Sequence, residues 1–158
     1  MSKKIAVIGI GNTLRRDDGI GIAILESLLK FYKRESVDYL NFGIASFDLL
    51  HRIQNYNTIL LIDSMNANLA AGELKIFELG KVDYELNGRP ISTHELSLKD
   101  IFELSKNLGL KTKIYVAGIQ VEDVSFGEGL SGFLENKKEE IVRRIGVFID
   151  ETLRPLRG

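Results

Sequence analysis

Two neighbouring carboxylates, Asp17 and Asp18, follow a glycine-rich turn in the segment VIGIGNTLRRDDGIG, residues 7–21. An apolar run, the turn and a helical pattern occur in the order of a βα unit that binds a phosphate. The third glycine of the dinucleotide pattern G-x-G-x-x-G is, however, replaced by Leu14 when the first two glycines are aligned. Two acids at the start of a helix compete with an anionic ligand, so their chemistry favours holding a cation instead.

Two more side chains extend this group into a candidate metal site. Asp63 ends the apolar run TILLID, and His94 lies in ISTHEL near a predicted helix start. In a doubly wound sheet, ligands bind beyond the carboxyl ends of the strands, so we expect Asp18, Asp63 and His94 to converge there. The helix dipole disfavours an imidazolium at a helix N-terminus, which leaves His94 neutral with a free lone pair. Two carboxylates and an imidazole suit a divalent metal of nickel or zinc character.

Each of these residues also has a purely structural interpretation. The acid pair can cap the first helix, Asp63 can form a turn at a strand end, and His94 can be structural or solvated. The other histidine, His51, is predicted on the flank of a helix and not as a ligand. Composition and spacing are compatible with the metal site, but they do not favour it over these structural interpretations.

The elements that position these residues alternate along the chain. Runs rich in β-branched residues predict strands at residues 4–10, 37–42, 58–62, 73–79 and 112–119. Apolar residues at helical spacing predict helices within residues 24–32, 101–108 and 141–153. This alternation predicts an α/β three-layer sandwich, in which a mostly parallel sheet of about five strands has helices on both faces.

Two local features refine this prediction. The connection SMNANLAAG, residues 64–72, is too short for a helical crossover, so we expect the strand at residues 73–79 to be antiparallel. The helix near His94 has two predicted starts, one with a capping box from Ser92 and one from Ser97.

Length and composition narrow the class of protein. A chain of 158 residues predicts a single domain over residues 1–158, and 21 basic against 22 acidic side chains argue against a nucleic-acid partner. The absence of cysteine excludes a thiol nucleophile, a disulfide framework and a thiolate metal site. No signal peptide or run of membrane-spanning length is predicted, so we expect a cytoplasmic protein, and we further expect a monomer.

Three segments, GIGNTLRRDDGIG, TILLIDSM and ISTHEL, resemble the signature segments of the hydrogenase maturation proteases. Their order and spacing suit this family along nearly the whole chain, including the later segment GIQVEDVSFGEGLS. The resemblance implies an endopeptidase that removes a C-terminal peptide from the nickel-loaded precursor of a nickel-iron hydrogenase large subunit. It also implies that Asp18, Asp63 and His94 are both the metal-ligating and the catalytic residues.

The resemblance further implies that the nickel is supplied by the precursor, with zinc-like divalent metals able to substitute. Binding of nickel already installed in the substrate would check maturation before the cut. Three routes to hydrolysis stay open at this point: polarisation of the scissile carbonyl by the metal, activation of water by the metal, and a carboxylate acting as general base.

The sequence departs from the family pattern in YLNFGIASFDLL, where Asn41, Gly43 and Ile44 stand in place of a frequent aspartate, glycine and threonine. This departure indicates either a subgroup with another hydrogenase as substrate or a member that has lost cleavage. Two alternatives therefore remain: a non-catalytic nickel-binding maturation partner and a nucleotide-binding α/β protein. A serine hydrolase has less support, because Ser64 lacks the G-x-S-x-G context of a nucleophile elbow.

Overall fold

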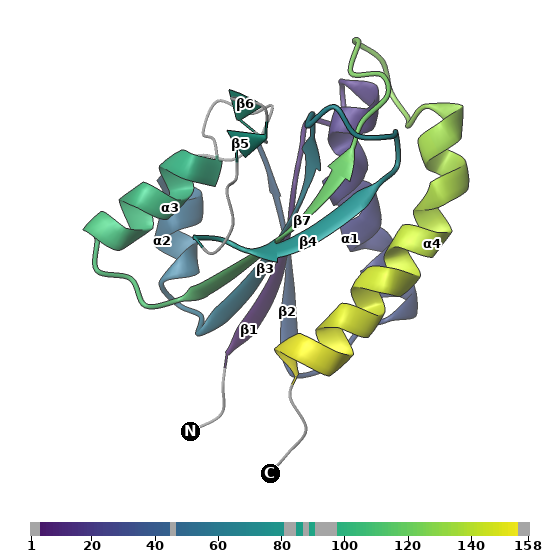
Figure 1. The fold of residues 1–158 in the computed structure, drawn as a ribbon. Coiled ribbons are helices and arrows are strands. Elements are labelled where there is room, and N and C mark those ends of the chain that lie inside the picture. The colour runs from purple at the N-terminus through teal and green to yellow at the C-terminus, as the bar shows by residue number, and fades with distance from the viewer. Residues whose placement is uncertain (1–3, 45–46, 81–84, 87–88, 91–97, 155–158) are drawn as a thin grey trace.

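A five-stranded sheet with the strand order β2-β1-β3-β7-β4 forms the centre of the protein in a computed structural model (Figure 1). The structure describes residues 4–44, 47–80, 85–86, 89–90 and 98–154. The strands are β1 (Ile5–Ile10), β2 (Val37–Gly43), β3 (Thr58–Met65), β4 (Leu74–Glu78) and β7 (Lys113–Gln120). Two short strands, β5 (Glu85–Leu86) and β6 (Arg89–Pro90), form a separate antiparallel pair.

Helices cover both faces of the sheet, as the sequence predicts (Figure 1). One face carries α1 (Ile20–Phe31), which follows the 3-10 helix η1 (Arg16–Gly19), and α4 (Gly132–Phe148), which continues into the π-helical turn η2 (Ile149–Leu153). The other face carries α2 (Phe47–Ile53) and α3 (Leu98–Asn107). Within the described ranges, no helix combines the length and the apolar composition needed to cross a bilayer.

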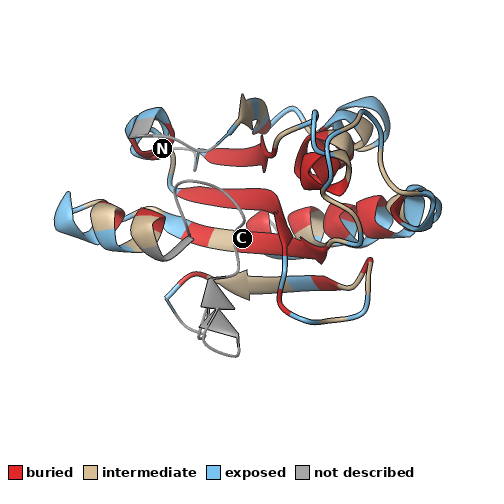
Figure 2. Cartoon of the chain, turned by 90° about the horizontal axis from the view of Figure 1, so that it is seen from above, coloured by how far each residue is buried: buried red, intermediate tan, exposed pale blue. Residues whose placement is uncertain are grey.

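The central strands are buried on both faces, which explains their nearly continuous apolar sequences. Successive residues of a strand point to opposite faces, so Val7 and Leu60 pack toward α1 and α4, while Ile8 and Leu61 pack toward α2 and α3. Figure 2 shows the buried residues gathered on the inner strands and the inward sides of the helices. The predicted three-layer α/β sandwich is confirmed.

The strand β4 is antiparallel, as the short connection before it predicts, and its partner is β7. The connection holds no helix and passes over the end of β7, where the buried side chain of Gln120 organises it. The Oε1 atom of Gln120 accepts a hydrogen bond from the backbone N–H of Ala67 at 2.8 Å. The carbonyl oxygen of Gln120 accepts another from Gly72, also at 2.8 Å.

The glycine-rich segment allows α1 to pack closely on the sheet. A Cβ atom at Gly21 would meet the carbonyl oxygens of Ile10 and Ile62, and one at Gly11 would meet the carbonyl oxygen of Asp18. Neither position tolerates a side chain while the backbone stays in place. These glycines therefore bring the start of the first helix, and Asp18 with it, against the ends of β1 and β3.

Candidate active site

Asp18 and Asp63 lie at the carboxyl end of the sheet, where its strand order reverses. The strand β1 pairs with β2 on one side and with β3 on the other, and both pairings are parallel. The pairing between β1 and β3 ends at Gly9 and Ile62, so Asp63 extends just beyond it. This reversal of strand order is the place where open α/β sheets bind their ligands.

A single serine joins the two carboxylates. The hydroxyl of Ser64 donates a hydrogen bond to Oδ1 of Asp18 at 2.7 Å, and the backbone N–H of Ser64 donates one to Oδ1 of Asp63 at 2.7 Å. The backbone N–H of Asn12 donates to the other oxygen of Asp18 at 3.2 Å. Asp18 is only 4% exposed and Asp63 only 2%, and buried carboxylates in proteins are paired, hydrogen-bonded or bound to metals.

The neighbouring acid, Asp17, has a different role. Its side chain is fully buried, and its oxygens accept hydrogen bonds from the backbone N–H groups of Glu122, Asp123 and Ser131 at 3.0, 2.9 and 2.7 Å. The hydroxyl of Ser131 donates a fourth bond at 2.8 Å. Ser131 is also the N-cap residue of α4. Asp17 therefore fastens η1 to the loop that leads into α4.

The helix-capping and turn roles expected for these acids are not found, although the role of Asp17 is structural. Gly19 occupies the N-cap position of α1, and no side chain caps either η1 or α1. Asp63 forms no turn, because it lies inside β3, two residues before the end of that strand. The second histidine, His51, lies in the last turn of α2 and is exposed, as predicted.

The third predicted ligand, His94, lies outside the described residues, as do the predicted capping residues Ser92 and Ser97. Asp18 and Asp63 supply hard oxygen donors, which suit a divalent cation, and a neutral imidazole would move that preference toward nickel or zinc. In the part of the chain that the structure describes, no group of three or more His, Cys, Asp or Glu side chains is placed to hold a metal.

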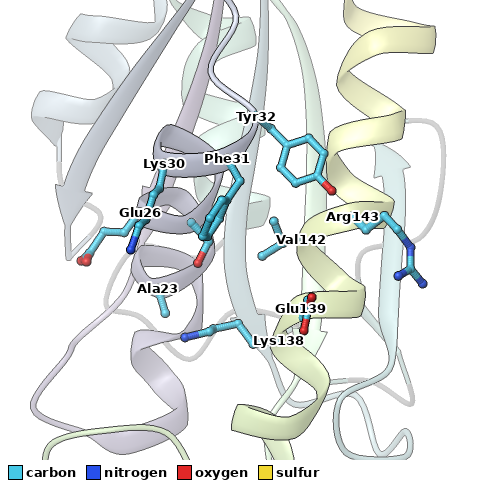
Figure 3. A pocket seen from close by; sticks show the side chains of 10 residues that line it. Ala23, Glu26, Lys30, Phe31, Tyr32, Lys138, Glu139, Val142 and Arg143 are labelled. Atoms are coloured by element: carbon cyan, nitrogen blue, oxygen red, sulfur yellow. The ribbon is translucent and has the colours of Figure 1, made fainter.

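A separate hollow of about 920 Å³ lies between α1 and α4 (Figure 3). Its lining mixes apolar residues such as Phe31 and Val142 with charged residues of both signs, among them Lys30 and Glu139. None of its lining residues belongs to the group around Asp18. This hollow is therefore distinct from the candidate site.

The sequence model of the hydrogenase maturation proteases matches residues 22–146. The chain belongs to the hydrogenase maturation protease family. A putative hydrogenase maturation protease from Methanocaldococcus jannaschii is 30% identical over 134 residues, which are 78% of this chain and 76% of that protein. The hydrogenase 2 maturation protease of Escherichia coli is 27% identical over 145 residues, 90% of this chain and 88% of that protein.

Solved structures agree with this membership. The hydrogenase maturating endopeptidase HybD from Escherichia coli matches with a TM-score of 0.81 and 27% identity, over 94% of this chain and 93% of that one. The maturation protease HycI from Thermococcus kodakarensis shares the fold, with a TM-score of 0.74 over 94% of both chains and 24% identity. As a member of this family, the protein is a hydrolase that acts on peptide bonds.

The segment that departs from the family pattern lies beside the candidate site. Asn41 is exposed, and its Oδ1 accepts a hydrogen bond from the backbone N–H of Gly43 at 3.1 Å. The carbonyl oxygen of Gly43 accepts one from Gly11 in the glycine-rich turn at 2.8 Å. Ile44 follows with 51% of its surface exposed. Asn41 thus serves a local turn at the end of β2.

Sequence reasoning missed two residues of the site, Ser64 and Asn12. The sequence presents Ser64 only as a candidate nucleophile, although its position next to Asp63 in a buried strand is a signal that its hydroxyl needs a buried partner. Asn12 stands in the glycine and asparagine part of the signature segment, and it contacts Asp18 through its backbone N–H. No sequence pattern reports a contact made by a backbone group.

Proposed function

We propose that this protein is an endopeptidase that removes a C-terminal peptide from the nickel-loaded precursor of a nickel-iron hydrogenase large subunit. One observation carries the proposal: a chain of this family holds two buried carboxylates, Asp18 and Asp63, joined through Ser64 where the strand order reverses. The same place in other open α/β sheets receives the ligand. Family membership also favours peptide hydrolysis over the nucleotide-binding alternative.

In this proposal Asp18, Asp63 and His94 form the active site and complete the coordination of the nickel that the precursor brings. Ser64 and Asn12 orient the oxygens of Asp18 through the hydrogen bonds described above. Nickel held by these residues would supply Lewis acidity at the scissile peptide, and zinc-like divalent metals would substitute for it in binding. Water is the attacking nucleophile, since the chain has no cysteine and no nucleophile elbow.

The departure at Asn41 and Ile44 is also consistent with a second candidate, a non-catalytic partner that binds the nickel-loaded precursor without cutting it. One experiment separates the two candidates. The protein is incubated with the nickel-loaded large-subunit precursor encoded in the same genome, and the products are weighed by mass spectrometry. Loss of one C-terminal peptide supports the protease, an intact precursor in a stable complex supports the partner, and neither cutting nor binding contradicts both.

We also propose that residues 1–158 form one domain that acts as a monomer in the cytoplasm. The continuous five-stranded sheet, with strands drawn from residues 5 to 120, supports the single domain. Light scattering of the purified protein tests the monomer, because a dimer would double the measured mass. Fractionation of cells tests the location.

A further inference from the structure

A leucine, an arginine and a phenylalanine are exposed on two paired loops next to Asp18. Leu14 is 59% exposed and Phe126 is 83% exposed. The guanidinium carbon of Arg15 lies 5.7 Å from the centre of the Phe126 ring. We name Leu14, Arg15 and Phe126 the rim surface. Single exposed apolar side chains are common, but arginine grouped with aromatic residues is typical of binding interfaces.

The rim surface is held in place by pairing between two loops. The backbone N–H of Gly127 donates to the carbonyl oxygen of Leu14 at 2.9 Å, and that of Arg16 donates to the carbonyl oxygen of Gly127 at 3.0 Å. The Nε atom of Arg15 donates to the carbonyl oxygen of Val124 at 3.1 Å. A partner that binds here finds the backbone already ordered, which lowers the entropic cost of binding.

The same loops connect the rim surface to the candidate active site. Oδ1 of Asn12 accepts a hydrogen bond from the backbone N–H of Leu14 at 3.0 Å, while the backbone N–H of Asn12 donates to Asp18. Asp17 fastens the second loop through the N–H groups of Glu122 and Asp123. In Figure 1 the connection from β7 to α4 projects beyond the end of β7, on the side where Asp63 lies.

The charge of the rim surface indicates what it binds. Among the residues that the structure describes, no carboxylate forms an ion pair with Arg15, so its remaining guanidinium N–H groups can bind an incoming anion. A C-terminal peptide always carries a terminal carboxylate, whatever its sequence. An occupant with one apolar side chain and one carboxylate matches both the apolar and the cationic parts of the surface.

We propose that the rim surface binds the C-terminal peptide of the hydrogenase precursor, the part that is cut away. An apolar side chain of that peptide packs on Leu14 and Phe126, and a carboxylate of the peptide pairs with Arg15. This inference rests on the proposed function and adds a docking surface for the substrate to it. Contacts made remotely from the cut hold the substrate before and during the reaction, so their loss raises KM more than it lowers kcat.

The test measures cleavage of the nickel-loaded precursor by Phe126→Ala, Leu14→Ala and Arg15→Glu variants. We expect KM to rise about tenfold for each variant while kcat stays within about twofold of the wild type. Because Leu14 and Phe126 are largely exposed, their truncation leaves the core intact, and circular dichroism verifies this.

Matched controls lie elsewhere on the surface. Phe31 is 67% exposed at the end of α1, and Leu108 is 64% exposed after α3. Phe31→Ala and Leu108→Ala remove comparable apolar surface, and Arg143→Glu reverses a charge on α4. We expect all three control variants to keep the KM of the wild type. An equal rise in KM for the controls would overturn the docking surface.

Two altered precursors identify the carboxylate. One has the acidic side chains of its C-terminal peptide changed to amides, and the other has an amidated C-terminus. One of these two precursors lacks the carboxylate that pairs with Arg15. With that precursor, we expect the Arg15→Glu variant and the wild-type protein to have the same KM. If Arg15→Glu raises KM with both altered precursors as much as with the unaltered one, the pairing of Arg15 with a carboxylate of the cut peptide is wrong.

The failures of the two proposals are distinguishable. If the wild-type protein leaves the nickel-loaded precursor uncut, the proposed function fails and the rim surface loses its substrate. If the wild type cuts and the rim variants cut with unchanged KM, only the rim surface is rejected.

Discussion

Asp63 is the residue on which the proposed chemistry depends most, because it is nearly inaccessible yet belongs to no cap or turn. Its Oδ1 accepts a hydrogen bond from the backbone N–H of Ser64, and the hydroxyl of the same serine donates one to Asp18. A carboxylate buried at such a place costs stability through lost hydration. We infer that function retains it there.

Asp63→Asn tests this inference while preserving the shape of the side chain. We expect the rate of precursor processing to fall by about 10²-fold or more, since the amide neither bears the charge nor serves as a base. Mass spectrometry of the products over time gives the rate. Glu151→Gln, an exposed carboxylate-to-amide change on η2, is the control and should process at the wild-type rate. Wild-type processing by Asp63→Asn would remove that aspartate from the mechanism.

Ser64→Ala removes the hydroxyl that contacts Asp18 while leaving the backbone bond to Asp63. Groups that orient a metal ligand are commonly worth about 10- to 100-fold in metal affinity or activity, so we expect processing to slow by about tenfold. The affinity for nickel-loaded precursor is measured without cutting in a protein that carries Asp63→Asn. Adding Ser64→Ala to that protein should weaken the affinity further. Ser105→Ala is the matched control, because Ser105 is buried in α3 and its hydroxyl donates to a backbone carbonyl, that of Phe102. Equal effects of both serine changes would indicate a general loss of packing.

At the scale of elements, Asp17 joins η1 to the loop before α4, although these segments lie more than a hundred residues apart in the sequence. Asp17→Ala deprives several backbone N–H groups and the Ser131 hydroxyl of their charged acceptor. We expect the free energy of unfolding to fall by about 3 kcal/mol or more, measured by urea denaturation. Glu35→Gln at an exposed position should change it by less than about 0.5 kcal/mol. A loss for Asp17→Ala as small as that of the control would contradict the role of this aspartate as a fastener.

The elements themselves were largely predictable, because their signals are local. Continuous apolar runs indicated β1 and β3, and the short connection after Asp63 indicated an antiparallel β4. The choice of β7 as the partner of β4 was not predictable, since it depends on Gln120 holding the connection across the end of the sheet. The pairing of two strands that are distant in the sequence produces no local pattern in the sequence of either strand.

The site was predictable only in part, for a similar reason. The types and positions of Asp18 and Asp63 indicated that these two aspartates belong to one site. The topology of the sheet brings both of them to the carboxyl ends of the strands. The contacts that hold the pair and its surrounding loops come from Ser64, from backbone groups and from Asp17. Such contacts depend on the folded arrangement of loops, which residue types alone do not specify.

At the scale of the whole molecule, an ion pair ties the segment after α1 to η2 near the end of the chain. Arg34 donates two hydrogen bonds to Asp150, each at 2.8 Å, and Arg154 donates a third at 3.1 Å. The bonds from Arg34 are the main cause that lowers the pKa of Asp150 below its ordinary value of 3.8. The unfolded chain therefore binds a proton at this carboxylate more readily than the folded protein does.

This shift has a defined consequence for stability against pH. The contribution of Asp150 is fully present above its ordinary pKa and is lost as the pH falls from about 4 through the lower folded value. We expect Asp150→Asn to destabilise the protein by about 1 kcal/mol or less at pH 7, because the pair is partly exposed. The difference from the wild type should shrink toward pH 3 in denaturation experiments. A difference that stays constant between pH 7 and pH 3 would show that the charge of Asp150 contributes nothing.

The most direct measurement of the proposed function compares two preparations of the same large-subunit precursor, one loaded with nickel and one free of it. Each is incubated with the wild-type protein, and the mass of the precursor is followed with time. We expect the nickel-loaded precursor to lose a single C-terminal peptide and the nickel-free precursor to remain intact, because Asp18, Asp63 and His94 bind the metal that the substrate carries. Equal trimming of both preparations would contradict nickel recognition, and an intact nickel-loaded precursor would contradict the endopeptidase activity itself.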